Sequence, residues 1–190
     1  MWARDDAKLD RVRSLMEDDG LDALVVRAPD NVLYLTNLWS MKGYDACVFP
    51  REGEPVLICL EASAEDAART AWPSEVRYVR GYDEGDPRPV PARTLDAAVD
   101  AARGYGSVGL ELSLGTQASD RMVGEPTTFT KAWFDAFPDA ADATGLLARA
   151  RKPVGPHRPA MSGPGKGSAP TGYRGWKRRD SKSSTVLVVS

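Results

Sequence analysis

The chain has little of the chemistry that metal centres and nucleophilic catalysis require. Among its 190 residues there is one histidine, His157, which lies in a basic segment rich in proline that has no further carboxylate before Asp180. A Ser-His-Asp or Cys-His site needs a histidine in a segment that can hold a fixed geometry, and as a metal ligand His157 has no carboxylate near it in the sequence. The sequence therefore offers no candidate catalytic residue and no candidate metal ligand.

Long apolar runs and targeting segments are also missing. The longest apolar runs, near Leu21 and Val186, are far shorter than the roughly 20 residues that span a bilayer. The first six residues lack the basic start and apolar centre of a signal peptide. We therefore expect a cytoplasmic protein without a membrane segment, in which the two cysteines, Cys47 and Cys59, are buried thiols rather than a disulfide or a metal clip.

Charge divides the chain into two parts. Residues 1–150 hold 16 Lys and Arg against 26 Asp and Glu, whereas residues 151–190 hold 9 against 1. Gly, Pro and Ser make up 17 of the last 40 residues, a composition that resists packing. We expect a folded acidic domain over residues 1–150 and a disordered basic tail over residues 151–190.

Short strands are expected to alternate with helices along the acidic part, which indicates an α/β fold with a mixed sheet flanked by helices. The expected strands are Leu21–Val26, the hairpin Ala46–Phe49 and Pro55–Leu60, a strand through Val76 and Tyr78 with one solvated face, Ser107–Leu110, and Ala140–Thr144. The expected helices are one capped by Asp5 or Asp6 and ended by Gly20, a turn over Asn31–Leu35 headed by Asp30, Ser63–Trp72 with a Ser63–Asp66 capping box, Pro91–Arg103, two within Thr116–Phe137, and Leu146–Arg151.

One stretch of the acidic part resembles a known family. The sequences GLDAL, PDNVLYLTN and YDACVFPREGEPVLI, within Gly20–Leu60, are similar to the amino-terminal domain of the creatinase, prolidase and aminopeptidase P metallopeptidases. The resemblance extends over about residues 5–151. It implies a ribonuclease H-like α/β domain, a fold that does not by itself imply nuclease activity.

The resemblance also implies where catalysis would take place. In that family two divalent metal ions are held by two aspartates, one histidine and two glutamates of a separate carboxy-terminal domain. None of those ligands transfers to a position of this chain, so we expect no cofactor here and no hydrolysis by this domain alone. The activity implied for a parent enzyme is metal-dependent cleavage of an amide bond, in a proline peptide or in a small cyclic or amidine-like compound.

The loop from Asn37 to Tyr44 is the one place with a candidate site. Trp39, Met41, Lys42 and Tyr44 are costly to expose unless something covers them. In the family the equivalent loop commonly reaches the substrate pocket of the dimer partner, so these four residues are hypothesised to shape a substrate site in trans. The alternative is that Trp39 and Tyr44 pack into the core and Lys42 is solvated.

The tail and the partners remain open between alternatives. The segment Lys177–Arg179, with Tyr173 and Trp176 nearby, could bind nucleic acid through phosphates and stacking. The abrupt loss of the family pattern after Lys152 is instead what translation in a shifted frame would produce, and we prefer this truncated-product hypothesis to an evolved tail. A homodimer, or pairing with full-length homologues as an interaction domain, is the expected partnership. We expect no membrane partner.

Overall fold

The computed structural model describes residues 3–39, 44–73, 75–111 and 127–152. Within them, one sheet has the strand order β4-β3-β2-β1-β5-β6, and β2 is the strand that runs antiparallel to its neighbours. The strands are β1 (Ala23–Val26), β2 (Ala46–Pro50), β3 (Val56–Leu60), β4 (Glu75–Val79), β5 (Val108–Leu110) and β6 (Ala141–Asp142). The predicted mixed sheet of the ribonuclease H-like type is confirmed.

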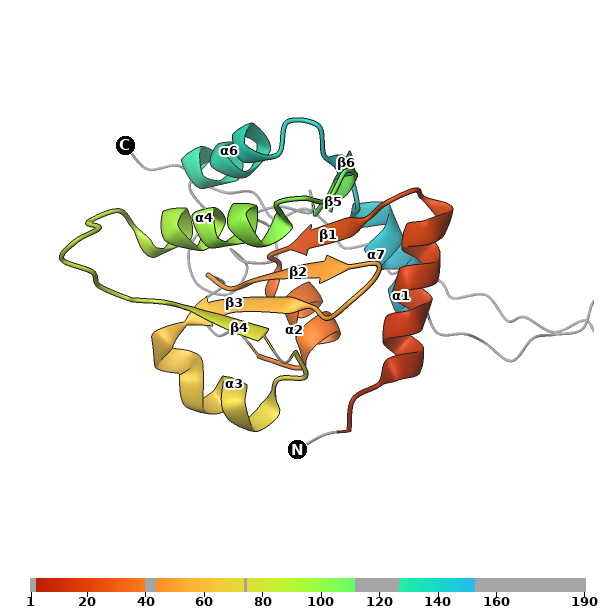
Figure 1. The fold of residues 1–190 in the computed structure, drawn as a ribbon, viewed down its shortest axis with the longest axis horizontal. Coiled ribbons are helices and arrows are strands. Elements are labelled where there is room, and N and C mark those ends of the chain that lie inside the picture. The colour runs from red at the N-terminus through yellow and green to blue at the C-terminus, as the bar shows by residue number, and fades with distance from the viewer. Residues whose placement is uncertain (1–2, 40–43, 74, 112–126, 153–190) are drawn as a thin grey trace, which may run out of the picture. The chain divides into compact units, whose positions relative to one another are not determined.

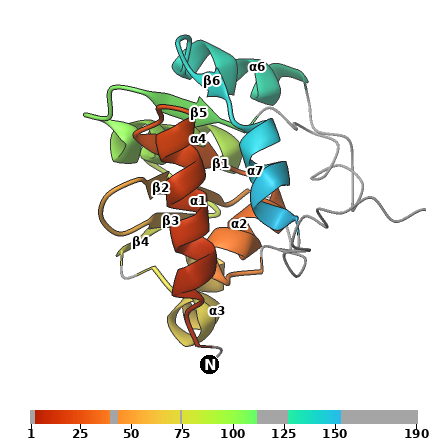
Figure 2. The ribbon, with the colours of Figure 1, turned by 90° about the vertical axis from the view of Figure 1, so that its right-hand side faces the viewer.

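Helices cover both faces of this sheet (Figure 1, Figure 2). On one face α1 (Asp6–Asp18), α2 (Pro29–Thr36), α3 (Ala64–Thr70) and α7 (Thr144–Arg151) enclose a core that includes Leu24, Phe49 and Leu57. On the other face α4 (Val90–Ala102) and α6 (Thr127–Ala136) enclose a second core that includes Val25 and Ile58. Successive strand residues point to opposite faces, so a strand buried on both sides must be apolar throughout, as ALVV in β1 is.

Several local predictions are confirmed by the backbone geometry. The carboxylate of Asp5 accepts a 3.0 Å hydrogen bond from the backbone N–H of Lys8 and so caps α1. Gly20, just after this helix, has φ +69°, a conformation that glycine adopts without steric cost. β2 and β3 form the expected antiparallel hairpin, with Gly53 at φ +100° in its turn.

Two predicted helix starts are wrong. α2 begins at Pro29 rather than Asn31, because the proline ring fixes φ and needs no N–H partner in the first turn. The N-cap residue is Ala28, which has no side chain that could cap the helix. Asp30 therefore lies inside the helix. The Ser63–Asp66 capping box does not form. A 3₁₀ turn over Glu61–Ser63 places Ser63 at φ −96°, ψ 6°, outside the extended region of a capping residue, and Asp66 pairs with Arg69 instead.

The solvated side of β4 also differs from the prediction. Tyr78, expected inward, is 47% exposed, whereas Val79 is buried. β4 is an edge strand that pairs with β3 alone, so neither of its faces is fully covered, and Val76 and Val79 contact the two cores from opposite sides. The alternation of apolar and polar residues in β4 therefore did not indicate which face of the strand contacts solvent.

The remaining elements lie close to their predicted positions, with α7 beginning two residues before Leu146, at Thr144. The first of the two helices expected within Thr116–Phe137 and the basic tail from residue 153 onward lie outside the described residues. The boundary near Arg151 stays a prediction. None of the helices in the described part of the chain combines the length and apolarity that crossing a membrane requires.

Of the described glycines, Gly109 has the least room for a side chain. A Cβ atom at this position of β5 would lie 2.8 Å from side-chain atoms of both Leu21 and Leu24, and 3.1 Å from Cβ of Ala143. We expect Gly109→Ala to lower the free energy of unfolding by about 1–3 kcal/mol through overpacking. Gly145→Ala is the matched control: its Cβ would meet nothing within 4 Å, and alanine in α7 should stabilise the helix by about 0.5–1 kcal/mol. Urea unfolding of both variants checks this; equal stability of the two would contradict it.

Candidate functional site: the carboxyl edge of the sheet

β1 and β5 are parallel neighbours, so their carboxyl ends lie at the same edge of the sheet, and the next described helices after them, α2 and α6, pack on opposite faces. β1 continues into α2, which packs on one core, while the segment after β5 leads to α6 on the other. In open α/β sheets such a switch point at the carboxyl ends of parallel strands is the usual place for a ligand. Arg27 and Glu111 directly follow these two strands and therefore lie at the switch point.

Glu111 occupies the switch point with its own carboxylate. Its side chain is completely buried, and one carboxylate oxygen accepts backbone N–H bonds from Arg27 (3.1 Å) and Ala28 (2.9 Å). The other oxygen accepts a hydrogen bond from Nδ2 of Asn31, in the first turn of α2. A helix N-terminus favours an anion, and here the protein supplies that anion itself. The position where many α/β proteins bind a ligand's anion is thus filled from within, and Glu111 orients the start of α2.

Arg27 connects this edge to α6. Its guanidinium carbon lies 5.4 Å from the ring centroid of Trp133, and both residues are buried. Trp133 in turn stacks on Phe137, with ring centroids 6.3 Å apart and planes inclined by 15°. The arginine over the indole face provides a cation–π contact that holds α6 against the end of β1.

The candidate loop begins on a fixed base. Thr36 is buried; its hydroxyl donates to the carbonyl of Val32 (2.7 Å) and accepts from the N–H of Leu38 (3.2 Å). Asn37 ends α2 in the left-handed conformation at φ 62°, and its amide donates to the carbonyl of Thr70 (2.8 Å). The side chain of Leu38 is buried in the core. The residues that precede Trp39 are thus fixed by hydrogen bonds and by burial.

The far end of the loop is fixed as well. Asp45 is buried and its carboxylate accepts a 3.2 Å hydrogen bond from the N–H of Leu60, at the end of β3. Between the two anchors, Trp39 is 44% exposed and Tyr44 is 40% exposed. Neither aromatic belongs to the buried core clusters of the described residues, and the substrate-site hypothesis stays a prediction. Met41 and Lys42 lie outside the described residues.

The two cysteines contribute no nucleophile at this edge. Both are free thiols buried in the core, as predicted. Burial raises the pKa of the Cys47 thiol far above its usual range; burial, and then the nearby Asp45 carboxylate, raise the pKa of Cys59 to about 12. A thiol that stays protonated near neutral pH is a poor nucleophile and a poor metal ligand.

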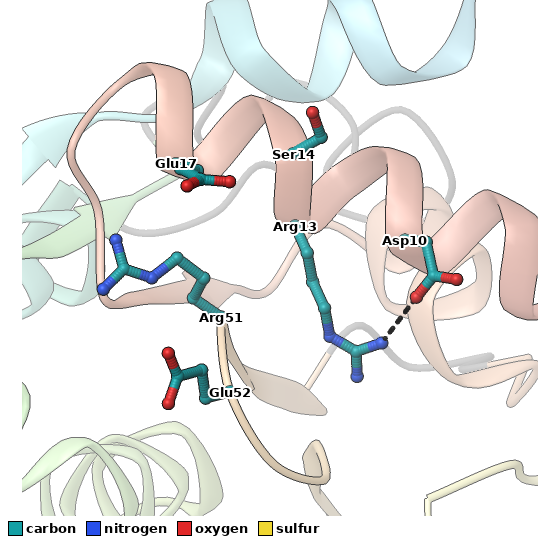
Figure 3. A pocket seen from close by; sticks show the side chains of 6 residues that line it. All are labelled: Asp10, Arg13, Ser14, Glu17, Arg51 and Glu52. Atoms are coloured by element: carbon teal, nitrogen blue, oxygen red, sulfur yellow. Dashed lines mark hydrogen bonds and ion pairs between the residues drawn. The ribbon is translucent and has the colours of Figure 1, made fainter.

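A depression lies at the opposite edge of the sheet. It is lined by charged side chains of α1 and of the β2–β3 turn, with one serine (Figure 3): Asp10, Arg13, Ser14, Glu17, Arg51 and Glu52. Its arginines are already engaged, Arg13 with Asp10 (3.2 Å) and Arg51 with Asp22 (3.2 Å). Across the described ranges, no three His, Cys, Asp or Glu side chains are grouped closely enough to hold a metal ion.

Sequence reasoning found the loop but missed Glu111. The only signal for it was a glutamate that directly follows the apolar strand Val108–Leu110, where the chain should still be buried. A charged residue at such a position must have hydrogen-bond partners. Its partners lie more than 80 residues away along the chain, so the sequence alone did not show them.

Taken together, the sheet, its two helical layers and the anchored edge loop define a ribonuclease H-like α/β domain. The chain belongs to the Creatinase/Prolidase N-terminal domain family, whose sequence profile matches residues 8–152. The resemblance noted from Gly20–Leu60 is therefore confirmed over nearly the whole acidic part.

Individual relatives agree with this family. The chain is 32% identical over 111 residues to an ectoine hydrolase from Halomonas elongata, an alignment that covers 55% of this chain and 28% of that protein. The prolidase from Pyrococcus horikoshii has a similar structure, with 17% identity, a TM-score of 0.53, and coverage of 76% of this chain and 35% of that one. The N-terminal domain of the peptidase PepQ from Mycobacterium tuberculosis gives 22% identity and a TM-score of 0.54, with 76% and 98% covered. The chain thus spans about a third or less of the length of the ectoine hydrolase and of the prolidase.

Proposed function

We propose that this domain is a non-catalytic part of an Xaa-Pro peptidase or creatinase-like metallohydrolase system. Its role is to pair with a catalytic chain and to present the loop Trp39–Tyr44, with Met41 and Lys42, at that chain's substrate pocket. Hydrolysis would then take place on divalent metal ions held by the partner. The profile match to an N-terminal domain supports this division of roles.

One observation carries the proposal: two exposed aromatics flank a loop whose two ends are both anchored. Trp39 and Tyr44 project from a base held by Thr36, Asn37 and Asp45. Aromatic side chains on a rigid support lose little conformational entropy on binding and supply much contact area. Such a loop suits recognition of a partner and its substrate.

The substrate class follows from the relatives' names alone. An ectoine hydrolase and several Xaa-Pro or proline dipeptidases are among the similar proteins. We propose a small compound with a hydrolysable C–N bond, either the cyclic amidine ectoine or an Xaa-Pro dipeptide, as the substrate of the paired assembly. Assays with both compounds distinguish these two.

The test measures both hydrolysis by the purified chain and its binding to a full-length homologue. The purified chain with manganese should hydrolyse neither ectoine nor an Xaa-Pro dipeptide, and it should co-elute with full-length Halomonas elongata ectoine hydrolase from a sizing column. Trp39→Ala should weaken this pairing at least about tenfold, because interface aromatics are frequent hot spots, and should leave the unfolding temperature nearly unchanged.

The matched control is Tyr82→Ala, an exposed aromatic that lies outside the loop and is 78% exposed. It should leave pairing unchanged. Stoichiometric metal in the purified chain together with turnover would refute the non-catalytic role. Unfolding of the domain by Trp39→Ala would instead support core packing of that side chain.

A further inference from the structure

Cationic side chains without a carboxylate partner gather on one face of the domain. Most arginine and lysine side chains of the described residues lie within 4.0 Å of a carboxylate, as Arg77 does with Glu75 and Asp100. The cations that do have such a neighbour are Arg4, Arg13, Arg51, Arg69, Arg77, Arg80, Arg88, Arg103, Lys131 and Arg149. Within the described ranges, four that do not are found together: Lys8, Arg11, Arg151 and Lys152.

Three of these cations, Lys8, Arg11 and Arg151, lie near two half-buried aromatic rings, those of Tyr34 and Trp72. The fourth, Lys152, follows Arg151 in the chain. Nζ of Lys8 lies 4.1 Å from the ring centroid of Trp72 and 4.7 Å from that of Tyr34, and the guanidinium carbon of Arg151 lies 5.6 Å from the Tyr34 centroid. We call this surface the α1–α7 patch. It consists of Lys8, Arg11, Tyr34, Trp72, Arg151 and Lys152.

The patch is held in a fixed arrangement by the end of α7. Arg11 donates to the carbonyl oxygens of Arg149 (3.0 Å) and Lys152 (2.9 Å), and the Tyr34 hydroxyl donates to the carbonyl of Ala150 (2.9 Å). Nη2 of Arg151 is buried and has no hydrogen-bond acceptor among the described residues. A buried N–H donor without an acceptor is destabilising.

The charge of the patch is opposite to that of the domain around it. Residues 1–150 carry a formal net charge of −10, from 16 Lys and Arg against 26 Asp and Glu. Partial burial lowers the pKa of the Lys8 ammonium, and the nearby Asp5 carboxylate raises it by less, so its attraction does not compensate for the lost solvation. A further anion nearby would add to that attraction.

We propose that the α1–α7 patch is a docking site for an acidic segment of another polypeptide chain. Carboxylates of that segment accept hydrogen bonds from Lys8 and Arg151, while its apolar atoms pack on the edges of Tyr34 and Trp72. Tryptophan, tyrosine and arginine on one preorganised surface are the composition of an interface hot spot. The site does not use Trp39 or Tyr44, so it is independent of the loop proposed above.

An acidic protein fits the patch better than a nucleic acid does. Single-stranded nucleic acid binds by stacking bases on ring faces, and Lys8 and Arg151 already lie over the faces of Tyr34 and Trp72. A short peptide segment with two or three carboxylates can bind through the cations alone, without access to the ring faces.

Zero-length crosslinking tests the proposal at one atom. The full chain is mixed with an octaglutamate peptide and a carbodiimide, which joins a lysine amine to a contacting carboxylate, and the products are mapped by mass spectrometry. We expect at least about fivefold more crosslinking at Lys8 than at Lys131, which is paired with Asp135, and the excess should fall steeply between about 20 and 200 mM salt. Mapping by residue separates Lys8 from the lysines of the tail.

A charge-matched pair of variants completes the test. Arg151→Gln should lower crosslinking at Lys8 at least about threefold, whereas Arg69→Gln, which removes a cation already paired with Asp66, should leave it unchanged. Equal crosslinking at Lys8 and Lys131, or no effect of Arg151→Gln, would overturn the proposal. Stronger protection of Lys8 by an oligothymidylate than by octaglutamate would overturn it in favour of nucleic acid.

Discussion

Glu111→Ala should lower the free energy of unfolding by at least about 4 kcal/mol. The change leaves the N–H groups of Arg27 and Ala28 and the amide of Asn31 buried without their acceptor, and each such donor costs about 1–3 kcal/mol. Small domains have roughly 5–15 kcal/mol in total, so this single substitution approaches the threshold of unfolding. Guanidinium unfolding followed by circular dichroism measures the loss.

Glu111→Gln separates hydrogen bonding from charge. The amide oxygen can still accept from Arg27 and Ala28, and Asn31 can turn its own amide so that Oδ1, which has no partner among the described residues, accepts from the new N–H₂ group. We expect a loss of only about 1 kcal/mol. Glu65→Gln, at an exposed position of α3, should change nothing measurable. If Glu111→Gln were as damaging as Glu111→Ala, the charge at the helix N-terminus would be the dominant contribution.

Trp133→Ala should cost about 3–5 kcal/mol, the usual loss when a buried tryptophan is removed from a core. Its side chain is 3% exposed, stacks on Phe137 and makes a cation–π contact with the guanidinium of Arg27. Removing it leaves a cavity and also leaves Arg27 buried without its aromatic neighbour. The second consequence should detach α6 from the carboxyl edge, which hydrogen exchange of the α6 amides would detect.

The adjacent residue supplies the control for this variant. Phe134→Ala changes an aromatic in the same helix turn that is 41% exposed, so we expect a loss of less than about 1 kcal/mol. Both variants gain the same small helix propensity from alanine. Similar losses for the two would mean that the contact between Arg27 and Trp133 does not anchor α6.

Local signals predicted most of the fold correctly. The apolar run Ala23–Val26, the glycine at position 53 and the helical spacing of Leu9, Val12 and Met16 each arise from a few neighbouring residues, and the structure confirms the elements that they indicated. The errors lie at element ends. Asp30 and Ser63 looked like capping residues, but Pro29 started its helix earlier and a 3₁₀ turn intervened before α3.

Some features of the candidate site could likewise be predicted from the sequence, and others only from the structure. The sequence alone placed aromatic residues, a methionine and a lysine in one loop, and it showed that the acidic part has no histidine to build a metal centre. The tertiary structure decided that Trp39 and Tyr44 are exposed, that Glu111 fills the switch point, and that Lys8 and Arg151 meet over Tyr34. Periodicity and turn chemistry act over a few residues and can be read along the chain. Burial, ion pairing and cation–π contacts join residues tens to more than a hundred positions apart, and only folding brings them together.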